Sequence, residues 1–202
     1  MFSAAKTSGP SGYFINNSLR VRGADASAYL NRTPASAGNL RTWTYSAWVK
    51  RGKLTPAAGG QSLFYAGNTT TSPRGGIVFG NAGDDKLTIS GAIYNTGATA
   101  LQLETSAQYR DPSAWYHVVV ALDTTQATAA NRCKLYINGS QVTAFGTATY
   151  PALNDQLQYN DAILHATRHP SGNYNYDGYL AEVNFVDGQA LTPSSFGSTN
   201  AT

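Results

Sequence analysis

Short stretches of alternating apolar and polar residues, separated by turn residues, constrain the fold of this chain most. In TWTYSAWVK, Trp43, Tyr45, Ala47 and Val49 fall on one face of an extended strand. Further stretches of this kind follow: QSLFYAG, GGIVFG, KLTISGAIY, ALQLET, WYHVVVALD, KLYING, AILHA and YLAEVNFV. Gly, Pro, Asn and Asp turns separate them, and no segment keeps helical periodicity over three turns. The pattern predicts an all-β sandwich or barrel.

Two neighbouring segments predict local detail. WYHVVVALD is apolar on both faces, which is typical of a central strand covered on both sides or of one at the middle of a curved sheet. In KLYINGSQV, Asn138 and Gly139 can both adopt positive φ, so the segment predicts a two-residue type I′ hairpin. The Asn-x-Ser pattern at the same place recurs elsewhere in this Ser/Thr-rich chain. We therefore interpret Asn138 as a turn residue and not as a glycan carrier.

Charge is sparse and unevenly distributed. Charged residues make up 12% of the 202 residues, and the net charge of +3 is too small to indicate nucleic-acid binding. Residues 1–53 carry +7, however, and the remainder carries −4. This first quarter forms either a solvated basic face or a docking surface for an acidic partner, with Lys50, Arg51 and Lys53 as the docking candidates.

The remaining bulk features predict one domain with two short tails. The single cysteine, Cys133, excludes an internal disulfide scaffold. The N-terminus lacks an apolar stretch of signal-peptide length, and no aliphatic run is long enough to insert into a membrane. We expect an N-terminal arm over residues 1–18, a sandwich over 19–197 and a tail over 198–202. The arm is either a disordered terminus or a segment ordered by a neighbouring subunit.

Three motifs in order carry a family resemblance. They are WTYSAWVKRG, WYHVVVALDTTQATAANRCKLYINGSQV and DGYLAEVNFVDGQALTPSSFG. Together they resemble the concanavalin A-like jelly-roll sandwiches, specifically the laminin-G-like group, from Leu19 to Gly197. The resemblance implies an all-β, two-sheet antiparallel jelly-roll sandwich.

A narrower resemblance concerns location. SLRVRGADASAYLNRTPASAGNLRTWTYSAWVKRG, RDPSAWYHVVVALDTTQATAANR and YDGYLAEVNFVDGQALTPSSFG look like a variant found in tailed-bacteriophage virion proteins of the tail-fibre or lectin-like kind. This resemblance implies a virion location, other virion proteins as partners and a homo-oligomer within the particle. It also leaves open a further C-terminal region, as longer relatives have.

Enzymatic chemistry finds little support in the residues. Glycoside hydrolysis needs two carboxylates that flank the sugar. The chain has only two glutamates, Glu104 and Glu182, and neither begins the Glu-x-Asp pattern of the enzymes with this fold. The histidines show no metal-binding spacing, and we interpret His117 as a core residue. We therefore predict a protein that is not an enzyme.

One loop is the best sugar-binding candidate. HPSGNYNYDGY interleaves tyrosines, which can stack on sugar rings, with side chains that can bind hydroxyls. The candidates are Tyr174, Tyr176, Tyr179, Asn173, Asn175 and Asp177. LNDQLQYND is a second polar-aromatic stretch. The same tyrosines could instead pack on neighbours at the rim of the sandwich or form a subunit contact.

No cofactor follows from the sequence with certainty. The family resemblance implies that Ca²⁺ is possible at a rim loop, because relatives bind it through Asp, Asn and carbonyl oxygens. Asn81, Asp84 and Asp85 are the metal candidates, and the alternative is that they are turn residues.

Three functions remain open. The first is attachment of a virion to a host glycan, as part of a tail fibre or receptor-binding protein. The second is a capsid or tail decoration protein in which the sandwich is a rigid docking unit. The third and weakest is a glycoside hydrolase.

Overall fold

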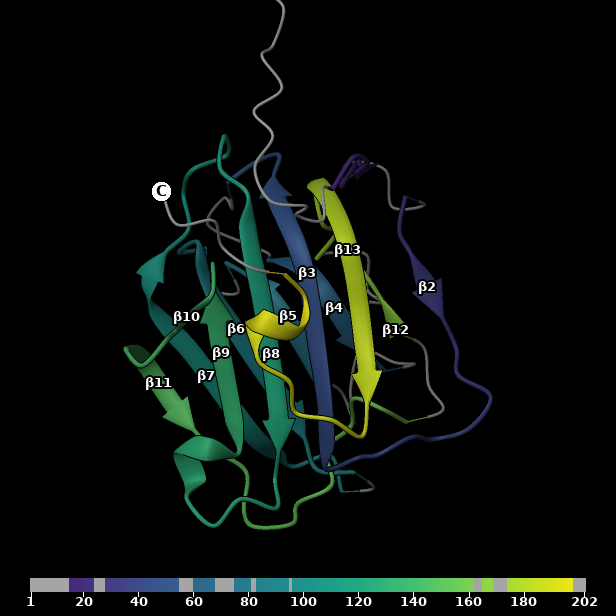
Figure 1. Ribbon diagram of the computed structural model, residues 1–202, viewed down its shortest axis with the longest axis vertical. Helices are drawn as coiled ribbons and strands as arrows, with labels where there is room; N and C mark the ends of the chain where they lie inside the picture. Colours follow the sequence, from purple (N-terminus) through teal and green to yellow (C-terminus); the bar gives the residue numbers. More distant parts are fainter. Residues whose placement is uncertain are drawn as a thin grey trace, which may run out of the picture.

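Two antiparallel sheets packed face to face make up the protein in a computed structural model (Figure 1). The structure describes residues 15–23, 28–54, 60–67, 75–80, 83–94, 96–161, 165–168 and 174–197. The six-stranded sheet has the order β1 (Leu19–Val21), β13 (Gly178–Asp187), β3 (Thr42–Arg51), β8 (Tyr116–Asp123), β9 (Cys133–Ile137) and β10 (Ser140–Gln141). The seven-stranded sheet has the order β11 (Phe145–Thr149), β7 (Thr99–Gln108), β6 (Lys86–Ala92), β5 (Gly75–Phe79), β4 (Gln61–Ala66), β12 (His165–Ala166) and β2 (Asn31–Arg32).

Strands from opposite ends of the chain lie side by side, as in a jelly roll. The first strand, β1, pairs with the last, β13, and β13 pairs with β3. Single 3₁₀ turns, η1 (Ala129–Asn131) and η2 (Pro193–Ser195), are the only helical elements of the described residues. No helix in this part of the chain has the length and apolarity needed to cross a membrane. The two-sheet antiparallel jelly-roll prediction is confirmed.

The core lies between the sheets and is built by the alternation visible in β3. Trp43, Tyr45, Ala47 and Val49 share one face of this strand, as predicted, and that face is the buried inner one. The Trp43 ring contacts the ring of Tyr159, with centroids 4.6 Å apart. Aromatic side chains of this size each bury a large apolar area and so contribute strongly to the stability of the core.

Strand β8 is buried along nearly its whole length, which confirms the prediction of a strand covered on both sides. Its outer face is covered because the C-terminal segment folds back over the six-stranded sheet (Figure 1). Thr44 Oγ1 donates to the carbonyl of Gln189 at 2.6 Å and accepts from Leu191 N at 2.8 Å. The Phe196 ring meets the buried His117 edge-on at 6.4 Å. His117 is thus buried, as predicted, but it lies under the C-terminal segment on the outer face and not in the core between the sheets. Burial lowers its pKa.

The hairpin between β9 and β10 has the predicted turn. Asn138 and Gly139 have φ angles of 51° and 82°, and Ile137 pairs with Ser140 across the turn. The Asn138 Oδ1 atom accepts a hydrogen bond from His117 N at 2.8 Å. The turn side chain therefore also ties the hairpin to the start of β8.

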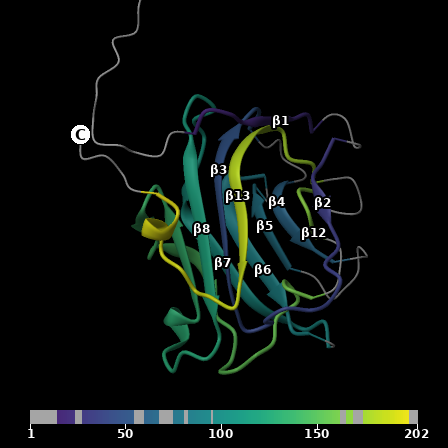
Figure 2. The same cartoon turned by 45° about the vertical axis from the view of Figure 1, so that its right-hand side comes forward.

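A bulge divides β13 into two halves. Strand β1 pairs only with residues 178–180, and the pairing of β13 with β3 shifts register between Ala181 and Asn184. Glu182, inside the bulge, has a φ of 48°. One extra residue in a strand exchanges the faces on which later side chains lie. As a result, Phe185 lies on the inner face of the sheet, as Leu180 does before the bulge. The edge of β13 after the bulge faces β2 and β12 (Figure 2).

Only part of the predicted division into arm, sandwich and tail falls within the described residues. Residues 1–14 and 198–202 lie outside the described residues. Residues 15–18 have no regular secondary structure, and β1 begins at Leu19. The division into arm, sandwich and tail stays a prediction.

Candidate functional site

The tyrosine-rich loop does not form one surface. Tyr176 is fully buried, and its hydroxyl donates to the carbonyl of Lys50 at 2.8 Å. Burial also raises the pKa of Tyr176. The proposed sugar contact at Tyr176 is therefore wrong, because a ring inside the core cannot stack on a ligand. Tyr174 and Asn175 are half-buried, and Asn173 lies outside the described residues.

The end of the same loop fastens β1 to β13. Asp177 pairs with Arg20 at 2.6 Å and accepts a hydrogen bond from Gly23 N at 3.2 Å. The Arg20 guanidinium lies 5.2 Å from the ring centre of Tyr179, which is 38% exposed. Of the predicted sugar contacts, Tyr179 keeps the most open ring, and a binding role for it stays a prediction.

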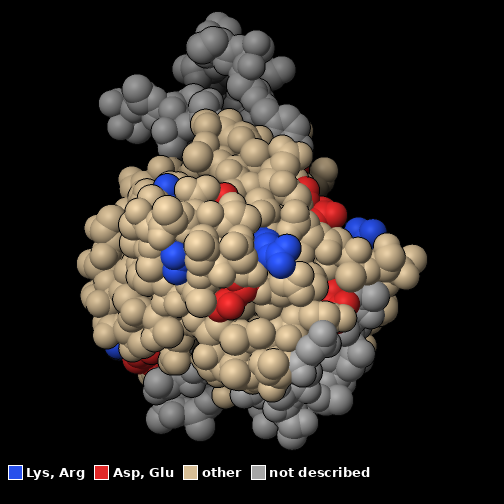
Figure 3. Space-filling model, turned by 90° about the horizontal axis from the view of Figure 1, so that it is seen from below, with Lys and Arg blue, Asp and Glu red and all other residues tan. Residues whose placement is uncertain are grey.

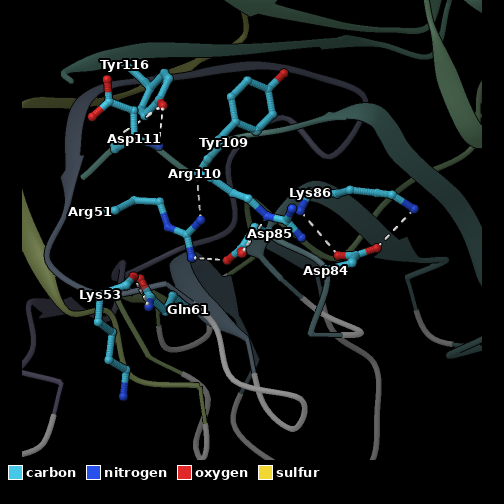
Figure 4. Close-up of polar contacts among 10 residues, drawn as sticks. All are labelled: Arg51, Lys53, Gln61, Asp84, Asp85, Lys86, Tyr109, Arg110, Asp111 and Tyr116. Carbon is cyan, nitrogen blue, oxygen red and sulfur yellow. Dashed lines mark hydrogen bonds and ion pairs between the residues drawn. The ribbon is translucent and has the colours of Figure 1, made fainter. Parts of the chain in front are cut away.

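The predicted docking triad is split by the strand that carries it. Arg51 points into the core, where its guanidinium donates to Tyr109 O at 2.6 Å and to Asp85 Oδ1 at 2.8 Å (Figure 4). A docking role for Arg51 is wrong, because its side chain is fully buried. Consecutive strand residues point to opposite faces, so the half-buried Lys50 lies on the outer face and Lys53 is exposed in the following loop.

The face of the molecule seen from below carries no basic patch that could serve as a docking surface in place of that triad (Figure 3). There basic and acidic atoms are interspersed and gather into no patch of one sign (Figure 3). The uneven charge of the sequence is thus partly absorbed by internal contacts, such as those of Arg51 and Arg20.

The predicted calcium loop does not fit a calcium ion. Asp85 Oδ1 binds Arg51, and its Oδ2 accepts from Arg110 Nε at 3.3 Å (Figure 4). Asp84 pairs with Lys86 at 3.0 Å. Both carboxylates therefore already neutralise cationic side chains. Among the described residues no group of three or more acidic, His or Cys side chains could hold a metal ion, and Asn81 lies outside them. We call the buried pair Arg51 and Asp85, with the partly exposed Arg110 at its edge, the buried ion cluster.

A different place in the fold has the shape of a ligand site. A cleft of about 480 Å³ opens where the second half of β13 faces β4 and β2 across the side of the sandwich. Ligand pockets typically measure about 300–1,000 Å³. We call it the edge cleft. Its lining residues include Arg32, Phe64, Asn160, Val183, Phe185 and Asp187, together with the segment before and after Arg32.

The apolar part of the edge cleft is aromatic. Phe185 is half-buried and stacks on Phe64, with ring centroids 5.2 Å apart and an interplanar angle of 12°. Behind it Phe185 stacks on the core residue Trp43 at 5.3 Å. Val183, two residues before it, is 42% exposed. Phe185 is therefore a ring held firmly from behind that still borders the opening.

The polar part is a carboxylate and an amide fixed against each other. Asp187 Oδ1 accepts from Asn160 Nδ2 at 2.5 Å and from Asn39 N at 2.7 Å. Gly38 leaves room for this pair, because a Cβ there would lie 2.7 Å from Asp187 Oδ2. The exposed Arg32 stands on the β2 side. The cleft thus combines an aromatic floor with a carboxylate that is already held in place and an arginine on the β2 side.

Sequence reasoning found only part of the edge cleft. Asn160 falls in the second polar-aromatic stretch, LNDQLQYND, and Asp187 in a turn signal. No pattern in the sequence marks Phe185 or Arg32 as a candidate binding residue. Nothing in the linear sequence shows that β2, β4 and β13 converge, or that a bulge turns Phe185 inward.

The comparisons with known proteins agree with this fold. A laminin-G-type family described as the "Concanavalin A-like lectin/glucanases superfamily" matches residues 22–195. The comparison with curated proteins found no match.

Solved structures are similar over most of the chain. One is a heptameric SAP-like pentraxin from Limulus polyphemus, with a TM-score of 0.55, 14% identity and coverage of 88% of this chain and 78% of that one. Another is the CBM40 of the Ruminococcus gnavus IT-sialidase bound to α2,3-sialyllactose, with a TM-score of 0.52, 11% identity and coverage of 90% and 94%. Domains LG4-5 of the mouse laminin α1 chain match with a TM-score of 0.56 and 10% identity, covering 96% of this chain and 48% of that one. The fold is shared at these low identities, and the family match spans most of the chain. The protein belongs to the concanavalin A-like lectin/glucanase superfamily.

Proposed function

We propose that this chain is a non-catalytic carbohydrate-binding domain whose ligand lies in the edge cleft. The observation that carries the proposal is the pairing of a half-buried Phe185 ring with the fixed Asp187–Asn160 pair in a cleft of about 480 Å³. Sugars present an apolar C–H face and a rim of hydroxyls, and this cleft offers a surface for each.

The binding mode follows from the lining. One face of a sugar ring packs on Phe185, and its hydroxyls donate to Asp187 and accept from Arg32. Asn160 holds Asp187 in place, because its amide donates to Asp187 Oδ1 and to the Asn39 carbonyl. Asp187 and Asn160 already hold each other at 2.5 Å, so binding immobilises few additional side chains. Such preorganisation favours affinity because less conformational entropy is lost.

A non-catalytic role is supported by the placement of the nucleophile and carboxylate candidates. Glu104 lies on β7 of the seven-stranded sheet and pairs with Lys86 at 2.9 Å. Glu182 lies on β13 of the other sheet. Glycoside hydrolysis needs two carboxyl groups on either side of one bond, and these glutamates do not share a sheet. Cys133 is buried, which raises its thiol pKa to about 12 and keeps the thiol protonated.

A similar fold holding a sugar gives further support. The R. gnavus CBM40 has α2,3-sialyllactose bound, and this chain covers 94% of it. At 11% identity that similarity concerns the fold, so the cleft residues and not the neighbour carry the assignment.

The experiment is a glycan-array screen of the full chain, followed by calorimetric titration with the strongest hit. We expect Phe185→Leu and Arg32→Ala each to weaken binding by roughly tenfold, the equivalent of about 1.4 kcal/mol. Arg22→Ala is the matched control, because Arg22 is exposed and does not line the cleft. A folded sample that binds no glycan, or variants that bind like the parent, would overturn the assignment.

The cellular role extends this proposal. We propose that the domain attaches a bacteriophage virion to a host glycan as part of a tail fibre or receptor-binding protein, in a homo-oligomer with other virion proteins. The resemblance of its sequence motifs to tailed-bacteriophage virion proteins supports it. Attachment and decoration predict different results for virions. If the domain serves attachment, virions that carry the double variant Arg32→Ala, Phe185→Leu still incorporate the protein but no longer adsorb to host cells. Loss of incorporation on deleting residues 1–18, with adsorption of the cleft variants intact, would instead favour decoration.

A further inference from the structure

A second concavity, of about 390 Å³, lies on the outer face of the six-stranded sheet. Trp48 of β3, Trp115 just before β8 and Ala181 of β13 line it from the sheet side. Residues 15–18, which precede β1, line it from the other side. We call it the indole groove. It shares no lining residue with the edge cleft.

The sheet builds a shallow platform in the groove. Ala181 pairs with Trp48 across the strands, so a small side chain stands directly beside the large ring. Trp48 stacks on His117 with ring centroids 4.7 Å apart and an interplanar angle of 11°. Ser46 Oγ hydrogen-bonds His117 Nε2 at 3.0 Å and holds that ring in place. One face of the Trp48 indole is therefore supported from behind, while the half-exposed ring borders the groove.

The opposite wall supplies uncharged polar groups. Asn16, Asn17 and Ser18 provide two amides and a hydroxyl, and Ile15 is 39% exposed at the end of this wall. No lining residue within the described chain carries a charge. The edge cleft differs in this respect, because Arg32 and Asp187 line it.

We propose that the indole groove is a second binding site, for a neutral saccharide. A pyranose ring packs its C–H face on the indoles of Trp48 and Trp115, and the Asn16 and Asn17 amides bind its hydroxyls. The lack of lining charge favours a neutral sugar over an acidic one. The inference goes beyond the proposed function, because it uses other residues and does not depend on the cleft. The N-terminal segment becomes part of a binding site in this assignment.

The three tryptophans of the chain separate the two sites. Trp48 and Trp115 line the groove, whereas Trp43 is fully buried and stacks on Phe185 behind the edge cleft. Intrinsic fluorescence of a variant that keeps only Trp43 therefore reports on the cleft. The difference between that variant and the parent reports on the groove.

The test is a fluorescence titration of the full chain with neutral hexasaccharides of glucose, mannose and galactose. We expect at least one of them to change the emission, and Trp115→Ala and Asn17→Ala each to weaken its binding by roughly tenfold. Arg22→Ala is the control and leaves that affinity within about twofold, because Arg22 is exposed and lines neither the groove nor the edge cleft. Trp48→Phe keeps an aromatic ring against His117 and shows an intermediate loss.

The contradicting results are equally specific. If no hexasaccharide changes the emission, or if Trp115→Ala and Asn17→Ala bind like the parent, the groove assignment fails. If the change survives in the variant that keeps only Trp43 and disappears with Phe185→Leu, the ligand lies in the edge cleft. That outcome supports the proposed function and overturns the second site.

Discussion

The buried ion cluster and the edge cleft use the same kinds of side chain for opposite purposes. Arg51 and Asp85 pair inside the sandwich, with the Arg51 guanidinium 5.0 Å from the ring centre of Phe79. In the edge cleft Arg32 and Asp187 stand beside Phe185. Both places contain an arginine, an aspartate and a phenylalanine.

The two places differ in how much of the hydrogen-bonding capacity of the aspartate is already used. Both carboxylate oxygens of Asp85 accept hydrogen bonds from arginines, Oδ1 from Arg51 and Oδ2 from Arg110. Asp187 is exposed, and the two hydrogen bonds that position it both reach Oδ1. Completed polar groups stabilise a fold, whereas positioned but incomplete ones can bind a ligand. Residue type alone therefore does not distinguish a structural cluster from a binding site.

Removing the two arginines tests this contrast with the largest expected effect. Arg51→Ala leaves Asp85 buried with only the partly exposed Arg110 nearby, and we expect the free energy of unfolding to fall by about 3–5 kcal/mol. Arg32→Ala, at an exposed position, should change it by less than about 0.5 kcal/mol. Urea denaturation of the two variants measures both. Equal losses would show that the two sites do not differ as described.

A methyl group at Gly38 tests the preorganisation of the cleft. In Gly38→Ala the added carbon would lie 2.7 Å from Asp187 Oδ2 and would also press on the Asn160 amide. We expect a loss of about 1–2 kcal/mol in unfolding free energy and a larger relative loss of glycan affinity. Calorimetric titration beside urea denaturation separates the two effects. An unchanged affinity would mean that the Asp187–Asn160 pair does not position the ligand.

Much of the fold could be predicted because its signals are local. The alternation in β3 and the Asn138-Gly139 turn each lie within a few residues of sequence. The site could not be predicted in the same way. Plain alternation along β13 places Leu180 and Phe185 on opposite faces, and only the bulge at Glu182 puts them on the same one.

Burial was the second limit of sequence reasoning. Tyr176 and Tyr179 lie three residues apart in the polar stretch that leads into β13, yet the first is fully buried and the second is 38% exposed. The buried Tyr176 contacts Lys50, which lies 126 residues away and whose carbonyl accepts a hydrogen bond from the Tyr176 hydroxyl. Long-range contacts of this kind have no counterpart in local composition.

Those two tyrosines give a matched pair of hydroxyl deletions. Tyr176→Phe removes the donor to the Lys50 carbonyl, and we expect a loss of about 1 kcal/mol in unfolding free energy. Tyr179→Phe keeps the exposed ring and should change stability by only a few tenths of a kcal/mol. Thermal denaturation checks the order. A neutral Tyr176→Phe would contradict the core role given to that hydroxyl.

The smallest expected effect is a pH dependence at His117. Burial lowers its pKa in the folded protein below the ordinary value of 6.5, so the unfolded chain takes up this proton first as the pH falls. Stability should therefore decrease as the pH drops below about 6.5 towards the folded-state pKa, with a slope below about 1.4 kcal/mol per pH unit. His117→Gln, which can still hydrogen-bond Ser46, should flatten this part of the curve. Urea midpoints between about pH 7.5 and 5.5 measure it, and an identical slope in the variant would exclude His117 as the cause.

The most direct measurement is a backbone NMR titration of the full chain with the strongest glycan hit. We expect shift changes that cluster at Phe185, Asp187, Asn160 and Arg32, while the signals of Arg51 and Asp85 stay in place. Changes centred on the buried ion cluster, or no changes at the edge cleft while the glycan binds, would contradict it.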